Sequence, residues 1–479
     1  MYRVVPEVYG TQAESDARYI ALFGTRTRFV VMTLVLLCLT SIWSNILTFN
    51  FAVICMGNAS SAADSYSFTK AEQSWATSVV AIAALLANVP AVMTINRVGI
   101  RTIFTALGII SAAGTLLLPT AVKWGFPYVL ACRALQGLGF AGNFPLAPAI
   151  TMPVSGMLCE QYNWMSVFYA HGTMSLMLFL LYGLFYRNSP QKHPFVGQVE
   201  RGKISIGKTV IDKKASKAIP YAAILRTPAV WAVWAGAVGN FTAVNLLFLY
   251  SPLYLSQVLG MEAHHTGFVA AFPPLAQFIM KLACGAISDR IKCISEVNKF
   301  RIFNSIAFFG SATFFLILAG MSAETRHINM ILLGGAAGIL GATTGGFFKA
   351  GPVLSKQYSH FVTGNISIVL TLTMLVVPFI VSGLTKHNTH EEWRWVFVIT
   401  AGVQIVMNII FCVLIRGEPC VWTKEEWHRP RSVADLNSLA NGAPLATVYH
   451  PTVSPPVTVS VPVGLPPTAD ADAEPTNRF

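Results

Sequence analysis

The sequence contains few charged residues. Asp, Glu, Lys and Arg make up only 11% of its 479 residues and apolar residues make up 54%, whereas soluble domains carry about 25% charged residues. Uninterrupted apolar runs of about 20 residues recur along most of the chain, and each could cross a bilayer whose apolar core is about 30 Å thick. This composition excludes an ordinary soluble domain and predicts an all-α polytopic membrane protein. It also excludes a β-barrel, because barrel strands are short alternating segments.

Carboxylates and reactive clusters are missing from the apolar runs. All 21 Asp and Glu residues lie in loops, in tails or at the ends of runs, and the cysteines form no CxxC pair. We therefore expect no metal site, no organic cofactor and no catalytic residues, which argues against an enzyme. Five of the cysteines are interpreted as small buried hydrophobic residues, with no disulfide framework. They are Cys38, Cys55, Cys132, Cys284 and Cys412.

Positive charge is present but unevenly distributed. The formal net charge is +12, and the Lys and Arg residues concentrate between the apolar runs. The positive-inside rule produces this distribution, so we expect a cytoplasmic linker and no nucleic-acid binding. With residues 187–227 placed inside, only five of the 33 basic residues lie outside, and two, Arg133 and Lys281, lie within apolar runs.

The apolar runs form two clusters on either side of the basic linker. We therefore expect two six-helix halves with both termini cytoplasmic. The expected segments are a cytoplasmic N-terminal segment (1–28), an N-terminal transmembrane half (29–186), the cytoplasmic linker (187–227), a C-terminal transmembrane half (228–416) and a disordered cytoplasmic tail (417–479). The expected spans are about 29–56, 74–95, 102–122, 126–145, a Pro-rich segment to 158, 165–186, 228–250, 265–287, 302–321, 329–350, 361–384 and 395–416.

One apolar stretch is interrupted by prolines. The segment FPLAPAITMPVSG contains Pro145, Pro148 and Pro153, which disfavour a continuous helix. Two full crossings need about 40 residues, and residues 126–158 provide only 33. A shortened hairpin broken at one of the prolines gives about 12 spans with the fifth incomplete. A single kinked crossing gives 11 spans and places the nine basic residues of the linker outside, against the positive-inside rule.

Several stretches of the chain carry a resemblance to a known family. They are RALQGLGFAGNFP (133–145), NWMSVFYAHG (163–172), NSPQKHP (188–194), KLACGAISD (281–289) and TKHNTHEEWRWVFVITA (385–401). These stretches resemble the solute carriers that include sialin, the sodium/phosphate cotransporters and the vesicular glutamate transporters, which have the major facilitator fold. The resemblance covers about 20–416 and implies transport of organic anions or phosphate, coupled to protons, sodium or membrane potential.

The resemblance also explains the Pro-rich segment. In the family, the fourth span is followed by a cytoplasmic loop and then by a fifth span that ends in a similar Met-Pro motif. Here Pro145 is followed almost at once by TMPVSG, so the end of the fourth span, the loop and the start of the fifth are missing. This chain also has Ile46, Phe140 and Ala243 where the family has charged residues. Those departures argue against glutamate as substrate and against proton coupling through a carboxylate.

Two intramembrane cations without acids favour an anionic ligand, because a charge inside a membrane is costly and is usually functional. Arg133, Gln136, Phe140 and Asn143 recur at helical spacing and share one face of the fourth span. Arginine suits a carboxylate or phosphate, and the alternative is that its side chain snorkels or binds backbone carbonyls. In the second half the candidates are Lys281, Gln277, Asn240 and Asn245, which could equally hold helices together.

Three further features have predicted roles. His171, early in the sixth span, is a candidate proton relay, with a structural hydrogen bond as the alternative. The loops NRVGIR and SDRIK follow the second and eighth spans and resemble the charged gating loop of the superfamily. In the first loop, Asn96 replaces the acidic residue of that motif. The alternative is that the basic residues of both loops only fix the topology. The gating residues are Asn96, Arg97, Gly99, Arg101, Asp289 and Arg290. The sequon at Asn58 lies in an expected outer loop and is a candidate glycosylation site.

The sequence therefore predicts a secondary transporter of small organic anions or inorganic phosphate that works by alternating access. We expect a monomer in a lipid bilayer of the plasma membrane or of a vesicle, with H⁺ or Na⁺ as the coupling ion. The alternative is a transport-inactive truncated isoform that acts as a membrane sensor or partner protein, because part of the first half is missing.

Overall fold

The structure is a computed structural model that describes residues 23–57, 66–140, 146–205, 219–322 and 324–424. These residues belong to one compact unit, Met1–Lys424, and within them the chain forms helices and no strands. The helices of the N-terminal half are α2 (Thr27–Gly57), α3 (Lys70–Val98), α4 (Ile100–Trp124), α5 (Phe126–Leu138), α6 (Leu146–Gln161) and α7 (Trp164–Phe185).

The C-terminal half follows a linker that contains short helices. In the linker these are η1 (Pro190–Lys192), α8 (Gln198–Ser205) and α9 (Tyr221–Leu225). The half itself comprises α10 (Pro228–Leu253), the π-helical turn η3 (Tyr254–Val258), α11 (Ala263–Arg290), α12 (Glu296–Gly320), α13 (Arg326–Ile339), η4 (Leu340–Thr344), α14 (Phe347–Ser355), η5 (Lys356–Tyr358), α15 (Ser359–Leu384) and α16 (His390–Leu414), and η6 (Val421–Thr423) follows.

Local sequence signals explain where several helices begin. Thr69 and Thr389 each accept a hydrogen bond from the backbone N–H three residues later, while Glu72 and Glu392 bond back to the cap residue. These capping boxes satisfy N–H groups that a helix start would otherwise leave unpaired. Between α3 and α4, Gly99 adopts a φ of +95°, which a residue with a side chain would adopt only with strain.

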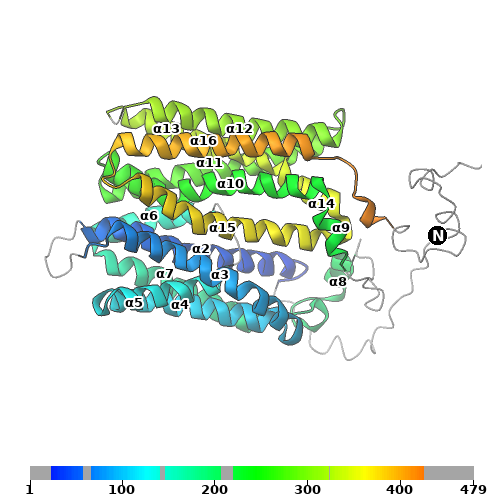
Figure 1. The fold of residues 1–479 in the computed structure, drawn as a ribbon. Coiled ribbons are helices and arrows are strands. Elements are labelled where there is room, and N and C mark those ends of the chain that lie inside the picture. The colour runs from blue at the N-terminus through cyan, green and yellow to red at the C-terminus, as the bar shows by residue number, and fades with distance from the viewer. Residues whose placement is uncertain (1–22, 58–65, 141–145, 206–218, 323, 425–479) are drawn as a thin grey trace, which may run out of the picture. The chain divides into compact units, whose positions relative to one another are not determined.

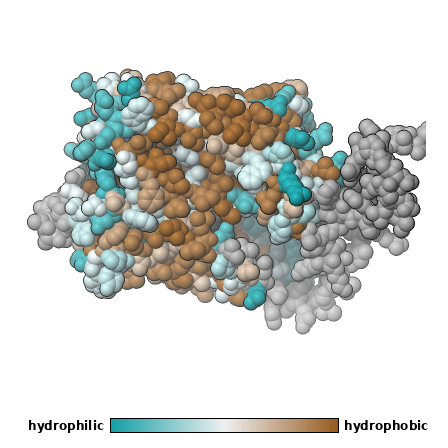
Figure 2. Space-filling view, in the orientation of Figure 1, coloured by the Kyte–Doolittle hydropathy of each residue, from teal (hydrophilic) through white to brown (hydrophobic). Residues whose placement is uncertain are grey.

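The surface has the character of a membrane protein. Eight helical segments among the described residues are long and apolar enough to cross a membrane, judged by length and composition. Figure 2 shows a hydrophobic band between two hydrophilic rims, with large apolar side chains such as Leu184, Leu86 and Val413 exposed. Water would not tolerate so extensive an apolar surface, whereas lipid would.

The fourth and fifth spans are both short. α5 has 13 residues and α6 has 16, and each is below the roughly 20 residues of a full crossing. The expectation of an incomplete fifth span is confirmed, and the fourth is shortened as well. α5 ends at Leu138 and α6 begins at Leu146, so Pro148 and Pro153 lie inside α6 and the break is at neither of these two prolines, while Pro145 lies outside the described residues.

The two short helices enter and leave the bundle at one end but pack against different partners, α5 mainly against α3 and α4 and α6 mainly against α11 and α2. Phe126, at the start of α5, packs against Phe68, just before α3. Near the end of α6, Cys159 forms a disulfide with Cys55, near the end of α2. We call this the disulfide end, and we call the opposite end, where α2 begins, the linker end. In Figure 1, α5 and α6 lie at the left and α8 and α9 at the right.

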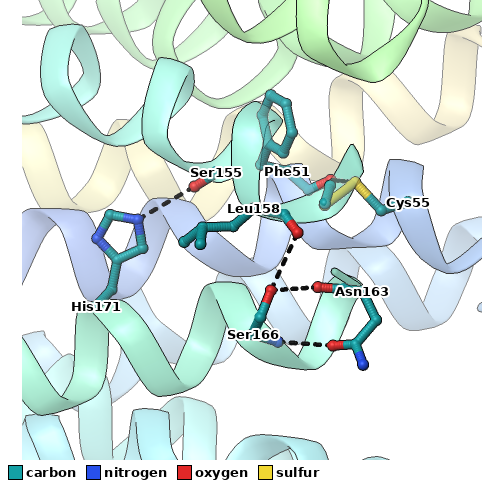
Figure 3. The surroundings of a disulfide bond; sticks show 8 residues. Phe51, Cys55, Ser155, Leu158, Asn163, Ser166 and His171 are labelled. Atoms are coloured by element: carbon teal, nitrogen blue, oxygen red, sulfur yellow. Dashed lines mark hydrogen bonds between the residues drawn. A yellow bond between two sulfur atoms is a disulfide. The ribbon is translucent and has the colours of Figure 1, made fainter. Parts of the chain in front are cut away.

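The disulfide corrects one expectation from the sequence. Cys55 is not a free buried hydrophobic residue, because it is bonded to Cys159 with a Cα–Cα distance of 6.2 Å, within the usual range for disulfides. The two cysteines are 104 residues apart, and the packing of α6 against α2 brings their helix ends together. Figure 3 shows the bond beside the α6–α7 turn, where Ser166 donates to the Leu158 carbonyl at 3.1 Å.

The linker is attached to the start of the bundle. One carboxylate oxygen of Glu200 in α8 accepts from the backbone N–H of Arg28 at 2.8 Å, and Thr27 donates to the Phe195 carbonyl at 2.6 Å. Glu200 is fully buried. A carboxylate at the first turn of α2 complements the positive end of the helix dipole, so the linker caps the first span.

The two halves meet through three helix pairs, α6 with α11, α3 with α15 and α2 with α10. The α6–α11 crossing is the tightest, because a Cβ added at Gly156 would lie 3.2 Å from the Gly267 Cα, and one added at Gly267 would lie 2.6 Å from the Met152 carbonyl. Small residues of this kind allow membrane helices to approach closely.

Candidate functional site

Arg133 lies at the centre of the N-terminal half and is fully buried. Its Nε donates to the Ala76 carbonyl of α3 at 2.9 Å, and its Nη1 donates to the Ile46 carbonyl of α2 at 2.9 Å and to Gln136 Oε1 at 2.7 Å. The guanidinium carbon lies 4.7 Å from the centre of the Phe49 ring. Arg133 therefore joins α2, α3 and α5 in this conformation, and only its Nη2 has no hydrogen-bond partner among the described residues.

Gln136 extends the same arrangement, since its Nε2 donates to the Thr115 hydroxyl of α4 at 2.8 Å. The structure thus brings Arg133 and Gln136 together, as the helical spacing predicts. Asn143, the third predicted member of this face, lies outside the described residues. Whether this group contacts a solute stays a prediction.

His171 is the centre of a second polar cluster. Its Nδ1 lies 2.8 Å from the Ser44 hydroxyl of α2, and its Nε2 lies 3.3 Å from the Ser155 hydroxyl of α6. Thr151 donates to Ser44 at 2.8 Å. Both ring nitrogens therefore face hydroxyl groups and no carboxylate. The three hydroxyl residues were not predicted from the sequence, because single Ser and Thr residues in apolar runs are too common to stand out.

In the C-terminal half, Asn240, Gln277 and Lys281 lie around the interruption between α13 and α14. Asn240 Oδ1 lies 3.5 Å from the Thr343 hydroxyl of η4. Gln277 and Lys281 stand one turn apart on α11, and a Cβ added at Gly341 of η4 would lie 2.7 Å from the backbone nitrogen of Lys281. The expected single span at 329–350 is therefore two helices with a 3₁₀ turn between them.

A cleft lies between the halves at the disulfide end. Residues of α2, α3, α10 and α15 line it, among them Asn50, Gln73, Tyr250 and Ser382. Lys70 also lines it, and its buried amino group has no hydrogen-bond partner in the described part of the chain. The sequence analysis did not single out Lys70, because its neighbours in the cleft come from helices far apart in the sequence.

The two predicted gating loops lie at the linker end and differ in their contacts. In the first, Arg101 Nε donates to the Gly183 carbonyl of α7 at 2.8 Å, within the same half; Arg97 is exposed, and the side chain of Asn96 lies outside the described residues. In the second, Asp289 pairs with Lys349 of α14 at 2.7 Å, and Arg290 is exposed.

The gating role of these loops stays a prediction. Each loop charge with a partner finds it within its own half in this conformation. The predicted glycosylation site, Asn58, lies outside the described residues, so that role also stays a prediction.

The fold and these sites define a class: a polytopic helical membrane protein of two six-helix halves, with polar side chains gathered between its helices. The family comparison agrees. The model of the Major Facilitator Superfamily matches residues 40–152 and 144–352, and the chain belongs to this superfamily. It is therefore a protein of a membrane transporter family and not an enzyme.

Curated relatives lie in the branch that the sequence motifs indicate. Sialin of Homo sapiens is 26% identical over 404 residues, covering 76% of this chain and 80% of sialin. Vesicular glutamate transporter 1 of Xenopus tropicalis is 28% identical, and the match covers 67% of this chain and 60% of that transporter. The human sodium-dependent phosphate transport protein 1 is 26% identical, and the match covers 67% of this chain and 74% of that protein. The chain thus spans less than two thirds of that glutamate transporter.

Solved structures support the fold. A bacterial homologue of the human lysosomal transporter Spinster has a TM-score of 0.61 and 12% sequence identity, covering 81% of this chain and 96% of that chain. The alignment with sialin also contains gaps. It is 404 positions long, which is more than the number of residues in 76% of this chain of 479. Some of its positions are therefore gaps in this chain.

Proposed function

We propose that this protein is a secondary active transporter of small organic anions or inorganic phosphate. The observation that carries the proposal is the charge inside the bundle. Arg133 and Lys281 lie within the spans, and every carboxylate in the described spans lies in the first or last turn of its helix. A membrane interior with cations and no carboxylates attracts anions and disfavours cations.

The relatives support an anionic solute. Two of them are named for glutamate and for phosphate, both of which are anions at neutral pH. Arginine and lysine are the side chains that bind carboxylate and phosphate groups, arginine by a planar fork and lysine as a point charge.

Alternating access between the halves is the mechanism that best fits their contacts. At the disulfide end, Ser74 donates to the Pro378 carbonyl at 3.3 Å and Ser78 donates to the Leu375 carbonyl at 3.1 Å. These bonds join α3 to α15 across the halves, beside the cleft that Asn50 and Tyr250 line. Rocking of one half against the other would break such contacts and open or close the cleft.

The remaining features of the proposal concern setting and coupling. The basic linker and both termini lie in the cytoplasm under the positive-inside rule, in the plasma membrane or in a vesicle membrane. The protein works as a monomer in the bilayer and binds no nucleic acid. H⁺ or Na⁺ is the coupling ion, and His171 is the candidate proton relay, although its two hydroxyl partners also suit a structural role.

The test is uptake of labelled anions into proteoliposomes that contain the purified protein. We expect uptake of an organic anion or of phosphate that depends on an imposed pH, sodium or voltage gradient. The absence of uptake for every anion under every gradient would contradict the proposal.

A transport-inactive isoform is the second candidate, and the short helices α5 and α6 favour it. A span that does not cross fully leaves part of the wall of a transport pathway unbuilt, and irregular backbone in lipid is costly. Anion binding without uptake would support this candidate, and coupled uptake would exclude it.

A further inference from the structure

Helix α6 covers only part of α2. The two helices run parallel, since Cys159 is bonded to Cys55 and, nearer the start of both helices, Thr151 donates to Ser44 at 2.8 Å. α6 begins at Leu146, five residues before Thr151. Its cover of α2 therefore ends about five residues before Ser44, and the first part of α2, at the linker end, extends beyond the start of α6.

The burial of α2 changes at the same level. Residues 40–49 are all buried, whereas the exposed residues of α2, apart from the terminal Gly57, lie at or before Leu37. Thr33 and Leu37 precede Ser44 by eleven and seven residues, which are three turns and two turns, so they continue the face that α6 covers further along. The exposed apolar side chains of this part are Phe29, Met32, Leu36 and Leu37.

The same change occurs on α11. α6 and α11 run antiparallel, since Glu160 lies 3.7 Å from His264 and, nearer the start of α6, the Met152 carbonyl lies 2.6 Å from a Cβ added at Gly267. Leu282 follows His264 by 18 residues, which is five turns, so it lies on the same face of α11. It is 62% exposed. The face that α6 covers at the disulfide end is therefore uncovered toward the linker end.

The uncovered part of α2 matches one leaflet of a bilayer. Thr27 to Leu37 spans about 15 Å at 1.5 Å per residue, which is half of a hydrocarbon core about 30 Å thick. Only seven residues separate Leu138 from Leu146, too few to add a helix of this length and also connect α5 to α6. Irregular backbone is not stable in contact with lipid, whereas an acyl chain has no hydrogen bonds to satisfy.

Exposed cations border both uncovered faces at the linker end. Arg26 and Arg28 lie at the start of α2, and Arg290 and Lys292 lie at the end of α11. None of the four forms an ion pair among the described residues, and the carboxylate of Asp289 is already paired with α14. Basic sites between helices on the cytoplasmic side of a membrane attract the headgroups of anionic lipids.

We propose that an anionic phospholipid of the leaflet at the linker end binds between α2 and α11. An acyl chain lies against Leu37 and Leu282, where α6 would continue if it were longer, and the phosphate lies among the cations at the start of α2 and the end of α11. The lipid thus completes the wall that the short α6 leaves open. This inference does not depend on transport and applies equally to a transport-inactive protein.

The charge distribution favours this occupant over the alternatives. A neutral phospholipid would cover the apolar faces but would bring no net negative charge to the four cations. A second copy of this chain, with its net charge of +12, would add positive charge to positive charge. An anionic phospholipid satisfies the apolar faces and the cations together.

The experiment adds phosphatidylserine, or phosphatidylcholine with the same acyl chains, to delipidated full-length protein in detergent. Native mass spectrometry counts the retained lipid, and thermal unfolding measures the stabilisation. Leu37→Trp and Leu282→Trp fill the apolar faces, and Val413→Trp is their control, because Val413 is an exposed apolar residue of α16. Arg26→Gln with Lys292→Gln removes two of the cations. Its control is Arg416→Gln with Lys424→Gln, which removes two exposed cations beyond α16.

We expect the wild type and both controls to retain phosphatidylserine and to be stabilised by it more than by phosphatidylcholine. Arg26→Gln with Lys292→Gln should weaken the affinity for phosphatidylserine at least about tenfold, because each basic residue near an anionic headgroup contributes to binding. Leu37→Trp and Leu282→Trp should retain less of either lipid, because the indole ring takes the place of the acyl chain.

Three results would overturn the site. The first is equal retention of the two lipids by the wild type. The second is unchanged affinity for phosphatidylserine in the variant without the two cations and in both tryptophan variants. The third is a lipid-free dimer that phosphatidylserine does not dissociate, which would assign the uncovered faces to a second copy of the chain.

Discussion

In the N-terminal half, the Arg133 guanidinium is enclosed by carbonyls of α2 and α3 and by Gln136. In the C-terminal half, Lys281 is half-buried as a residue and its ammonium faces one aromatic ring. The planar fork of arginine can join several helices at once, whereas lysine is a compact charge on a flexible chain. Arg133 is therefore held by hydrogen bonds to two neighbouring helices, whereas the Lys281 ammonium forms no ion pair among the described residues.

The halves also differ in how their helices are fastened. The N-terminal half contains the two shortest spans and a disulfide between α2 and α6. The C-terminal half has no disulfide among its described cysteines and joins α12 to α16 by Asn304 and Asn408 at 2.9 Å. Shortened helices bury less surface against their neighbours, so the disulfide compensates for a loss of packing free energy in the N-terminal half.

The largest expected effect is on Arg133. Arg133→Ala should lower the free energy of unfolding by roughly 3–5 kcal/mol, as for other large buried side chains replaced by alanine, because it removes the contacts between α2, α3 and α5. Lys281→Ala should change stability much less, because Lys281 is only half-buried. Thermal unfolding of both variants in detergent measures the difference. Equal loss of stability in the two variants would contradict the comparison between the two cations.

The next effect concerns the disulfide. Reduction of the wild type, or Cys55→Ser with Cys159→Ser, should lower stability by about 2–4 kcal/mol, because the bond fixes α6 to α2. The control is Cys293→Ser, which changes an exposed free cysteine. Thermal unfolding with and without reductant gives the measurement. If reductant destabilises the double serine variant as much as the wild type, the bond is not the cause.

A smaller effect is expected at the polar joint of the C-terminal half. Asn304→Leu removes the bond to Asn408 and should cost about 0.6–1.7 kcal/mol, which is typical of hydrogen bonds between membrane helices. Thr313→Val on the same helix is the control, because Thr313 is exposed and bonds only to its own helix at Phe309. A cost at Asn304 as large as that of breaking the disulfide would remove the distinction between the halves.

The smallest effect is a pH dependence in the linker. Burial lowers the pKa of His193, Arg187 lowers it further, and Glu200 opposes them. The folded linker therefore favours the neutral ring, and its Nδ1 accepts from the Phe195 N–H at 3.3 Å. This stability is present above the ordinary histidine pKa of about 6.5 and is lost as pH falls toward the lowered value.

Limited proteolysis of the linker tests this dependence, with cleavage rates normalised to a peptide substrate at each pH. Cleavage between Arg187 and Arg201 should become faster on acidification, and His193→Gln should make it nearly independent of pH. Unchanged acid sensitivity in His193→Gln would assign the effect to another group.

Much of the fold followed from the sequence, because apolar length and charge asymmetry are strong signals in membrane proteins. The expected span 29–56 is close to α2, and 361–384 is close to α15. The interruption at η4 was not predicted, because Gly341 and its neighbours lie in an unbroken apolar run and glycine is common in membrane helices. The disulfide was missed because the pairing of distant cysteines depends on which helix ends lie together.

The predicted site residues were recognised by residue type, and their partners came from the structure. Charge within an apolar run identified Arg133 and Lys281, but only the fold shows that Arg133 binds carbonyls. Gln277 was one of several polar residues in the spans, and its lack of a partner among the described residues is a property of packing. Lys70 was missed because its neighbours in the cleft come from helices far apart in the sequence.

The close crossing of α6 and α11 has a mechanical consequence. Gly267 lies at the crossing, and Lys281 lies fourteen residues further along the same helix, which is about 21 Å at 1.5 Å per residue. A tilt of α11 by about ten degrees about this fulcrum would displace the backbone at Lys281 by roughly 4 Å. Since the disulfide fixes α6 to α2, such a tilt would make α11 a lever, in which a small rotation at one end of the molecule displaces the charge of Lys281 by a large distance.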